Sequence, residues 1–173
     1  RDHIMGSYAV YLMPTAAVSV SVWLKAYTPS LSAAQRLVAN IDSGTGYGLI
    51  INGPSSTDIC GVDNLCFRAK INGTVQIVTT PISNLTVGNW YHIVGTYDGD
   101  SLDLYLNGSQ IATTGSLTGN LVASNASVCI GANPNGNVSC NSNYVNGGVL
   151  DDVRIWNRAL SPTEIELLHR IYR

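Results

Sequence analysis

Two tight-turn dipeptides, Asp98-Gly99 and Asn107-Gly108, flank a short alternating segment in the middle of the 173-residue chain. Both dipeptides supply the positive φ angles that tight hairpin turns need. Between them, three leucines alternate with an aspartate and a tyrosine, so one face of the segment is apolar. This pattern predicts two β-strands joined at the first turn, with a second turn directly after them.

The rest of the chain repeats this rhythm of short strands separated by Gly, Asn and Pro. Alternation is strict in residues 18–25, where Trp23 lies on the face opposite the valines, so this strand is expected to be buried on both sides. Such a series is typical of an antiparallel sandwich. Further strands are predicted at residues 8–13, 36–41, 47–51, 65–71, 75–80, 110–114, 126–131 and 149–156.

One helix is predicted at the C-terminal end of the chain. Ser161 is an N-cap residue, Pro162 follows at the first helical position and Glu164 stands at the third, which together make a capping box. Ile165 and Leu168 then recur at helical spacing. They predict an apolar stripe that packs on the sandwich.

Two segments resemble one protein family. The run WYHIVGTYDG, with LYLNG after it, resembles the central hairpin of laminin-G-like domains, which belong to the concanavalin-A-like lectin and glucanase superfamily. Residues 147–161 look like the closing strand of that family and the start of its last helix. The resemblance implies one all-β domain over residues 7–173, an antiparallel jelly-roll β-sandwich with one short C-terminal helix. Residues 1–6 look like an expression-tag remnant.

The composition limits which classes of molecule the chain is expected to bind. Charged residues make up 12% of the chain and the net charge is −2. Binding to nucleic acid would need a basic face, and binding to an anionic lipid surface would need a polybasic patch. The low charge therefore disfavours both kinds of partner. No apolar run is long enough to span a membrane, which argues against direct insertion. The polar surface must come from Ser, Thr, Asn and Gly, which suits hydroxyl-rich ligands and is also ordinary for secreted β-proteins.

Four cysteines and five Asn-X-Ser/Thr acceptor sites indicate an extracellular or cell-surface location. The cysteines allow three pairings, of which the local one is preferred, Cys60 with Cys66 and Cys129 with Cys140. Zinc is the alternative, but these spacings do not match the short knuckles of zinc sites. The acceptor sites permit glycosylation without showing it; they are Asn72, Asn84, Asn107, Asn125 and Asn137.

The sequence contains no group of residues with the types and spacing that a catalytic site needs. Glycoside hydrolases of the superfamily carry paired glutamates in an E-x-D-x-x-E strand, because cleavage needs two carboxyl groups that flank the scissile bond. This chain has only Glu164 and Glu166, which point to different sides of the predicted helix. No G-x-S-x-G elbow is present, and His92 and His169 have no nucleophile near them in the sequence. The sequence therefore predicts that the chain is not an enzyme.

The resemblance also implies a calcium site. Laminin-G-like domains of this type often hold one Ca²⁺ on loop carbonyls and one or two aspartates, and calcium readily accepts such oxygen ligands. Asp151 and Asp152, at the start of the last predicted strand, match the acidic pair of the family, and Asp42 is a further candidate ligand. The alternative is that Asp151 caps a turn or pairs with Arg154 or Arg158.

Recognition residues are expected in the Asn-rich segment 133–148, which reads as a long loop. Tyr144 is the candidate for stacking on a sugar ring, since aromatic faces stack on sugars and amides bind their hydroxyls. The alternative is an ordinary solvated loop. At family strand positions, three tryptophans are expected in the core: Trp23, Trp90 and Trp156. The candidate ligand-binding set is Tyr144, Asn133, Asn135, Asn141 and Asn143, joined by Asp58 and Asp63 if the Cys60–Cys66 loop lies beside it.

These features predict a non-catalytic carbohydrate-binding module of a larger secreted or cell-surface protein, with a lectin-like role in cell adhesion and further domains beside it. Its partner is expected to be a glycan or a cell-surface glycoprotein. A protein-binding or purely structural laminin-G-like module is the alternative from another class, and a glycoside-active domain is a third, because one fold carries many functions.

Overall fold

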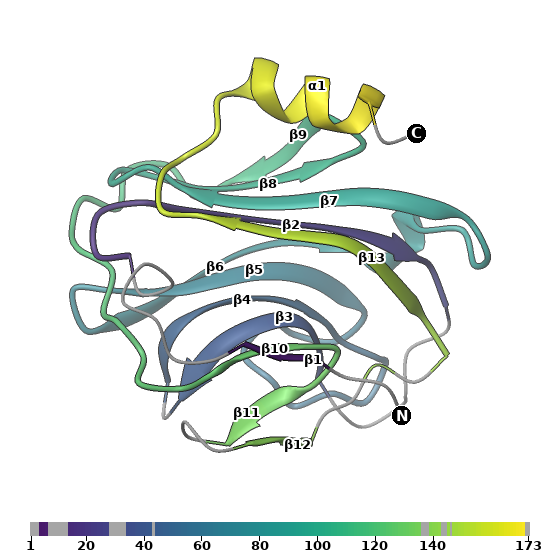
Figure 1. Cartoon of the computed structure of the whole chain (residues 1–173), viewed down its shortest axis with the longest axis horizontal. Helices are drawn as coiled ribbons and strands as arrows, with labels where there is room; N and C mark the ends of the chain where they lie inside the picture. Colours follow the sequence, from purple (N-terminus) through teal and green to yellow (C-terminus); the bar gives the residue numbers. More distant parts are fainter. Residues whose placement is uncertain are drawn as a thin grey trace.

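The computed structural model describes residues 4–6, 14–27, 34–42, 44–135, 139–142, 145 and 147–171. Two antiparallel sheets face each other across a buried core, and the helix α1 (Pro162–Ile171) lies outside the upper sheet in Figure 1. The predicted all-β jelly-roll sandwich with one short C-terminal helix is confirmed. No helix in the described part is both long and apolar enough to cross a bilayer.

The lower sheet in Figure 1 has six strands in the order β1-β10-β3-β4-β5-β6, and the upper sheet has five in the order β13-β2-β7-β8-β9. Strands that are distant in the chain therefore lie side by side, as β10 does with β3 and β13 with β2. The six-stranded sheet comprises β1 (Ile4–Gly6), β10 (Val128–Ile130), β3 (Gln35–Asp42), β4 (Thr45–Ile51), β5 (Asn64–Ile71) and β6 (Thr74–Pro81). The five-stranded sheet comprises β13 (Val149–Trp156), β2 (Val18–Lys25), β7 (Trp90–Tyr97), β8 (Leu102–Leu106) and β9 (Ser109–Thr113).

The predicted strands are found with small shifts at their ends, except for segment 8–13, which lies outside the described residues. The Asn-rich segment was expected as a loop, but it contains a small two-stranded sheet of β11 (Asn133–Asn135) and β12 (Ser139–Ser142). These strands are too short and too polar to show alternation. Ile4–Gly6, within the range interpreted as a tag remnant, pairs with β10. A short 3₁₀ turn, η2 (Ile82–Asn84), follows β6.

Both sheets contribute large apolar side chains to the core between them, and at one position a large side chain meets a glycine. Phe67 of β5 is fully buried and faces Gly95 of β7, where a Cβ atom would lie 2.3 Å from the Phe67 ring. Tyr97 is also buried, and its hydroxyl donates to the carbonyl of Gly119 at 2.7 Å. As predicted, β2 is buried on both faces, from Val18 through Leu24.

Helix α1 covers the outer face of the five-stranded sheet. Leu160 and Ile165 pack there on Val94 and Tyr105, with Trp156 partly buried beside them. The apolar stripe predicted from helical spacing therefore packs on the sandwich. Burial of this stripe is what stabilises so short a helix, since helices of this length are marginal alone.

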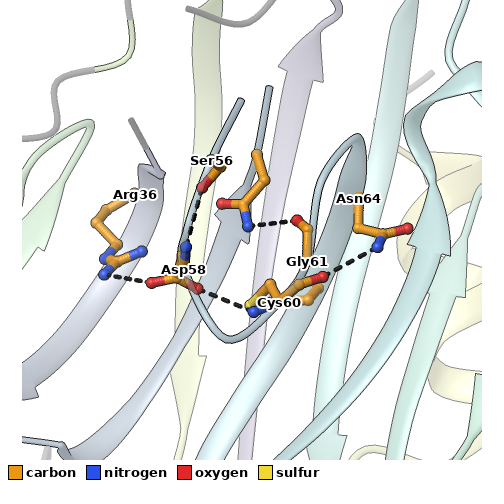
Figure 2. The surroundings of a disulfide bond; sticks show 8 residues. Arg36, Ser56, Asp58, Cys60, Gly61 and Asn64 are labelled. Atoms are coloured by element: carbon orange, nitrogen blue, oxygen red, sulfur yellow. Dashed lines mark hydrogen bonds and ion pairs between the residues drawn. A yellow bond between two sulfur atoms is a disulfide. The ribbon is translucent and has the colours of Figure 1, made fainter. Parts of the chain in front are cut away.

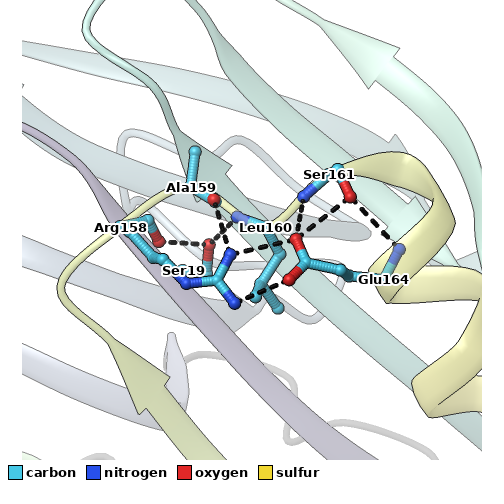
Figure 3. Close-up of polar contacts among 6 residues, drawn as sticks. All are labelled: Ser19, Arg158, Ala159, Leu160, Ser161 and Glu164. Atoms are coloured by element: carbon cyan, nitrogen blue, oxygen red, sulfur yellow. Dashed lines mark hydrogen bonds and ion pairs between the residues drawn. The ribbon is translucent and has the colours of Figure 1, made fainter.

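Helix α1 begins with the predicted capping box (Figure 3). The backbone N–H of Glu164 donates to Ser161 Oγ at 3.3 Å, and the backbone N–H of Ser161 donates to Glu164 Oε2 at 2.8 Å. Arg158 donates from both terminal nitrogens to the same carboxylate at 2.7 and 2.9 Å. Ser19 of β2 ties this turn to the sheet, because its hydroxyl donates to the Arg158 carbonyl and accepts from the Leu160 N–H, both at 2.8 Å.

Acid is expected to weaken the start of this helix. Hydrogen bonds from Arg158 and Ser161 lower the pKa of Glu164 from 4.5 to about 2. A carboxyl group with a lowered pKa contributes stability above its unfolded-state pKa and loses it as pH falls through the folded-state pKa. We expect the Tm of the parent to fall more steeply between pH 4.5 and pH 2 than that of Glu164→Gln, measured by circular dichroism. Glu166→Gln is the matched control, and equal slopes for parent and Glu164→Gln would contradict the prediction.

Candidate functional site

Two disulfides close loops over the outer face of the six-stranded sheet. Cys60 is bonded to Cys66 and Cys129 to Cys140, which confirms the predicted local pairing. Cys66 lies on β5 and Cys129 on β10, and both side chains are on the face turned away from Phe67. The segments that the disulfides close therefore lie on one side of the molecule.

Arg36 of β3 joins the Cys129–Cys140 segment to the turn that leads into Cys60. Its Nη2 donates to Asp58 Oδ2 at 3.1 Å, and its Nε donates to Asn133 Oδ1 at 3.1 Å. Asp58 belongs to the turn before Cys60, and Asn133 begins β11. The sequence predicted that the two loops could meet, and the structure brings Asp58 and Asn133 onto one guanidinium group.

The Cys60–Cys66 loop is held by further hydrogen bonds (Figure 2). Asp58 Oδ1 accepts from the Cys60 N–H at 3.1 Å, and Ser56 Oγ accepts from the Asp58 N–H at 3.3 Å. The side-chain amide of Asn64 donates to the Cys60 carbonyl at 3.0 Å, and that of Asn52 donates to the Gly61 carbonyl at 2.7 Å. These bonds give the loop a defined shape although it lacks regular secondary structure.

A second arginine lies on the same outer face. Arg68 of β5 is 8% exposed, and its register partner Gly48 in turn pairs with Ala39 of β3. Burial lowers the pKa of Arg68, the charge of Arg36 lowers it further and the charge of Asp58 raises it. The three charged groups are therefore close enough to interact.

The other predicted ligand-binding residues fall in different places. Asp63 is exposed, and its backbone φ is 52°. It lines a separate hollow of about 490 Å³ at one end of the sandwich, together with Tyr27, Leu85 and Val87. Asn135 and Asn141 lie on β11 and β12. Tyr144 and Asn143 lie outside the described residues, so their part in the site stays a prediction.

The predicted calcium ligands lie in two places. Asp151 and Asp152 occupy a bulge of β13, where Asp152 has a φ of 49° and pairs with Arg154 at 2.8 Å. Asp151 Oδ1 accepts from the Asp152 N–H at 2.8 Å. Asp42 ends β3 in the other sheet. Within the described residues no group of three or more His, Cys, Asp or Glu could hold a metal ion, and the calcium site stays a prediction.

Two histidines that are distant in the sequence stack under α1. His92 of β7 and His169 of α1 have ring centroids 6.1 Å apart, and each also lies against Trp23, at 5.3 and 5.7 Å. Burial, followed by the charges of His169 and Arg154, lowers the pKa of His92 to about 4. His92 is thus neutral at physiological pH and packs as an aromatic ring between sheet and helix.

The expectation that all three tryptophans lie in the core is wrong for Trp90. Trp23 is 8% exposed, but Trp90 is 42% exposed at the first position of β7. Its register partner is Lys25, which pairs with Val149, itself half exposed. Period-two alternation from His92 places Trp90 on the outer face, at the first position of β7, where it is exposed to solvent.

The family follows from a sequence comparison. A model of the laminin-G-like family of the concanavalin-A-like lectin/glucanases superfamily matches residues 6–166. This chain belongs to that superfamily. Among curated proteins, human pappalysin-1 is 26% identical over 160 residues, which are 88% of this chain and 10% of the relative. Mouse pappalysin-1 is 27% identical over 116 residues, which are 63% of this chain and 7% of the relative. This laminin-G-like chain therefore spans about a tenth or less of these relatives.

Solved structures show the same fold at low sequence identity. The binding domain of Paraclostridial Mosquitocidal Protein 1 superposes with a TM-score of 0.71 at 21% identity, covering 98% of this chain and 41% of that one. A botulinum neurotoxin type C structure, whose title links cell entry to two ganglioside molecules, gives 0.70 at 17% identity, covering 99% and 40%. The laminin-G-like chain thus matches about two fifths of each of these structures.

Proposed function

We propose that this laminin-G-like chain is a non-catalytic carbohydrate-binding module of a larger extracellular or cell-surface protein. The observation that carries the proposal is the junction at Arg36, which fixes polar groups of the Cys129–Cys140 segment and of the turn before Cys60 on one outer face. Rigid sheets that present polar loops are a common platform for recognition. The two disulfides support an oxidising compartment, since such bonds persist outside the cytosol.

The structural neighbours support a role in recognition. One botulinum neurotoxin DC binding domain was solved with SialylT, and it superposes with a TM-score of 0.70 at 16% identity. Another was solved with rat synaptotagmin II, at a TM-score of 0.62 and 18% identity. These ligands belong to the neighbours. They support a glycan as the first candidate ligand here and a protein as the second.

A glycan array with the parent and Tyr144→Ala tests this function. We expect weak binding by the parent, with a Kd of about 0.1–1 mM as is usual for shallow sites, and no measurable binding by the variant. The reason is that an aromatic face supplies most of the contact area with a sugar ring.

Trp90→Ala is the matched variant for the array, because Trp90 is an exposed aromatic residue on the other sheet. It should bind as the parent does. Loss of binding in Trp90→Ala but not in Tyr144→Ala would contradict the placement of the site. Binding to a protein array but to no glycan would favour the protein-binding alternative.

We also propose that Asp151 or Asp152 supplies a carboxylate to one Ca²⁺, with Asp42 as a further ligand. A ligand that binds only the folded state raises Tm with its concentration. We expect Tm to rise with calcium and to fall with EDTA, and Asp151→Asn to remove the difference. Identical melting curves for the parent in calcium and in EDTA would refute the site.

A further inference from the structure

The outer face of the six-stranded sheet carries more buried positive than negative charge. Arg36 is 7% exposed and Arg68 is 8% exposed, while Asp58 is the one carboxylate whose charge acts on Arg68. Two guanidinium groups and one carboxylate leave one positive charge without a partner among the described residues. Burying a charge without a partner is costly, so such a cluster favours binding of an anion.

The hydrogen-bond donors of the two arginines are also only partly used. Arg36 donates from Nε to Asn133 and from Nη2 to Asp58, but its buried Nη1 has no partner in the described part of the structure. The backbone of Arg68 pairs with the neighbouring strands, but its side chain makes no hydrogen bond within the described part of the structure. A purely structural junction would need Arg36 alone, since the Arg68 side chain makes no hydrogen bond to the described residues of either loop. The unused donors therefore point to a ligand.

We propose that Arg36 and Arg68 form a subsite for the carboxylate of an acidic sugar, such as a uronate or a sialate. The guanidinium fork matches a carboxylate in two parallel hydrogen bonds, which makes arginine the residue of choice for this group. The subsite lies between the Cys129–Cys140 segment and the turn before Cys60, where the sugar ring would meet Asn133. The inference rests on the proposed function and specifies its ligand class.

The test measures the Tm shift and the Kd for four small probes, which are glucuronate, N-acetylneuraminate, neutral glucose and inorganic sulfate. It uses the parent, Arg68→Met and Lys70→Met, with circular dichroism to check that each variant is folded. Lys70 is the matched control, because it is a cation on the same strand and the same face. We expect an acidic sugar to bind the parent and Lys70→Met alike, and Arg68→Met to bind it at least about 10-fold more weakly. Glucose and sulfate should bind no better to the parent than to Arg68→Met.

Four outcomes would overturn the inference. Acidic sugars that bind Arg68→Met as tightly as the parent would show that the arginine pair is structural. Sulfate that binds as tightly as glucuronate would show a general anion site. Neutral glycans that bind on the array while neither acid binds would refute the acidic ligand and leave the proposed function standing, whereas no binding of any glycan would contradict both.

Discussion

Asp58→Asn is expected to lower the free energy of unfolding by about 3–5 kcal/mol, because it removes one partner of a buried ion pair. The Asp58 side chain is 13% exposed and that of Arg36 is 8% exposed, so solvent screens their interaction little. The variant keeps the shape of the side chain and an oxygen that can accept from the Cys60 N–H. What it loses is the one negative charge that acts on both arginines among the described residues. Urea denaturation at neutral pH measures the change.

A double variant separates charge from shape in this prediction. Arg68→Met alone should be neutral or stabilising, since it removes the excess positive charge and breaks no hydrogen bond. In Asp58→Asn/Arg68→Met, part of the lost stability should return, because one buried cation has gone with the anion. A loss below 1 kcal/mol for Asp58→Asn, or no recovery in the double variant, would show that water screens the junction and that the charges are not coupled.

Phe67→Ala is expected to destabilise the fold by about 3–5 kcal/mol. The ring is fully buried between the sheets and lies against the backbone of Gly95, so its removal leaves a cavity that strands of two rigid sheets do not close. Gly95→Ala should also destabilise, since the new methyl group would overlap the ring. Thermal and chemical unfolding of both single variants measures these losses.

The double variant Phe67→Ala/Gly95→Ala tests whether the two residues act as a pair. Its loss should be smaller than the sum of the single losses, because the methyl group enters the space that the ring has left. Ile111→Ala, on the edge strand β9 and 38% exposed, is the surface control and should cost much less. Strict additivity in the double variant would mean that the sheets pack differently around Phe67.

The sequence predicted the elements whose cause is local. Alternation in β2 and β8, the turns after β7 and β8 and the capping box of α1 are all short-range patterns, and each is found in the structure. Asn107 and Gly108 both have positive φ, whereas of the first dipeptide only Gly99 does, in a four-residue loop. The disulfide pairing was predictable for the same reason, since each bond closes a short segment.

The junction at Arg36 was not predictable in this way. Arg36 meets Asn133, 97 positions away, only because β10 lies beside β3 and carries β11 with it. An arginine at the start of an apolar strand gives no local sign of such a partner. The prediction for Trp90 was wrong for a related reason, because the exposure of a residue at a strand end depends on what other elements cover it rather than on its sequence neighbours.

The bulge of β13 also bears on how separate copies of this domain behave in concentrated solution. Among the described strands, β13 is an edge strand that pairs only with β2, and a free edge can recruit a strand from another copy and start aggregation. At the bulge, Asp152 has left-handed backbone and Asp151, Asp152 and Arg154 place charges along the strand. Broken pairing and charge both oppose the addition of a further strand. We therefore expect the acidic pair to oppose edge-to-edge pairing between copies of this domain.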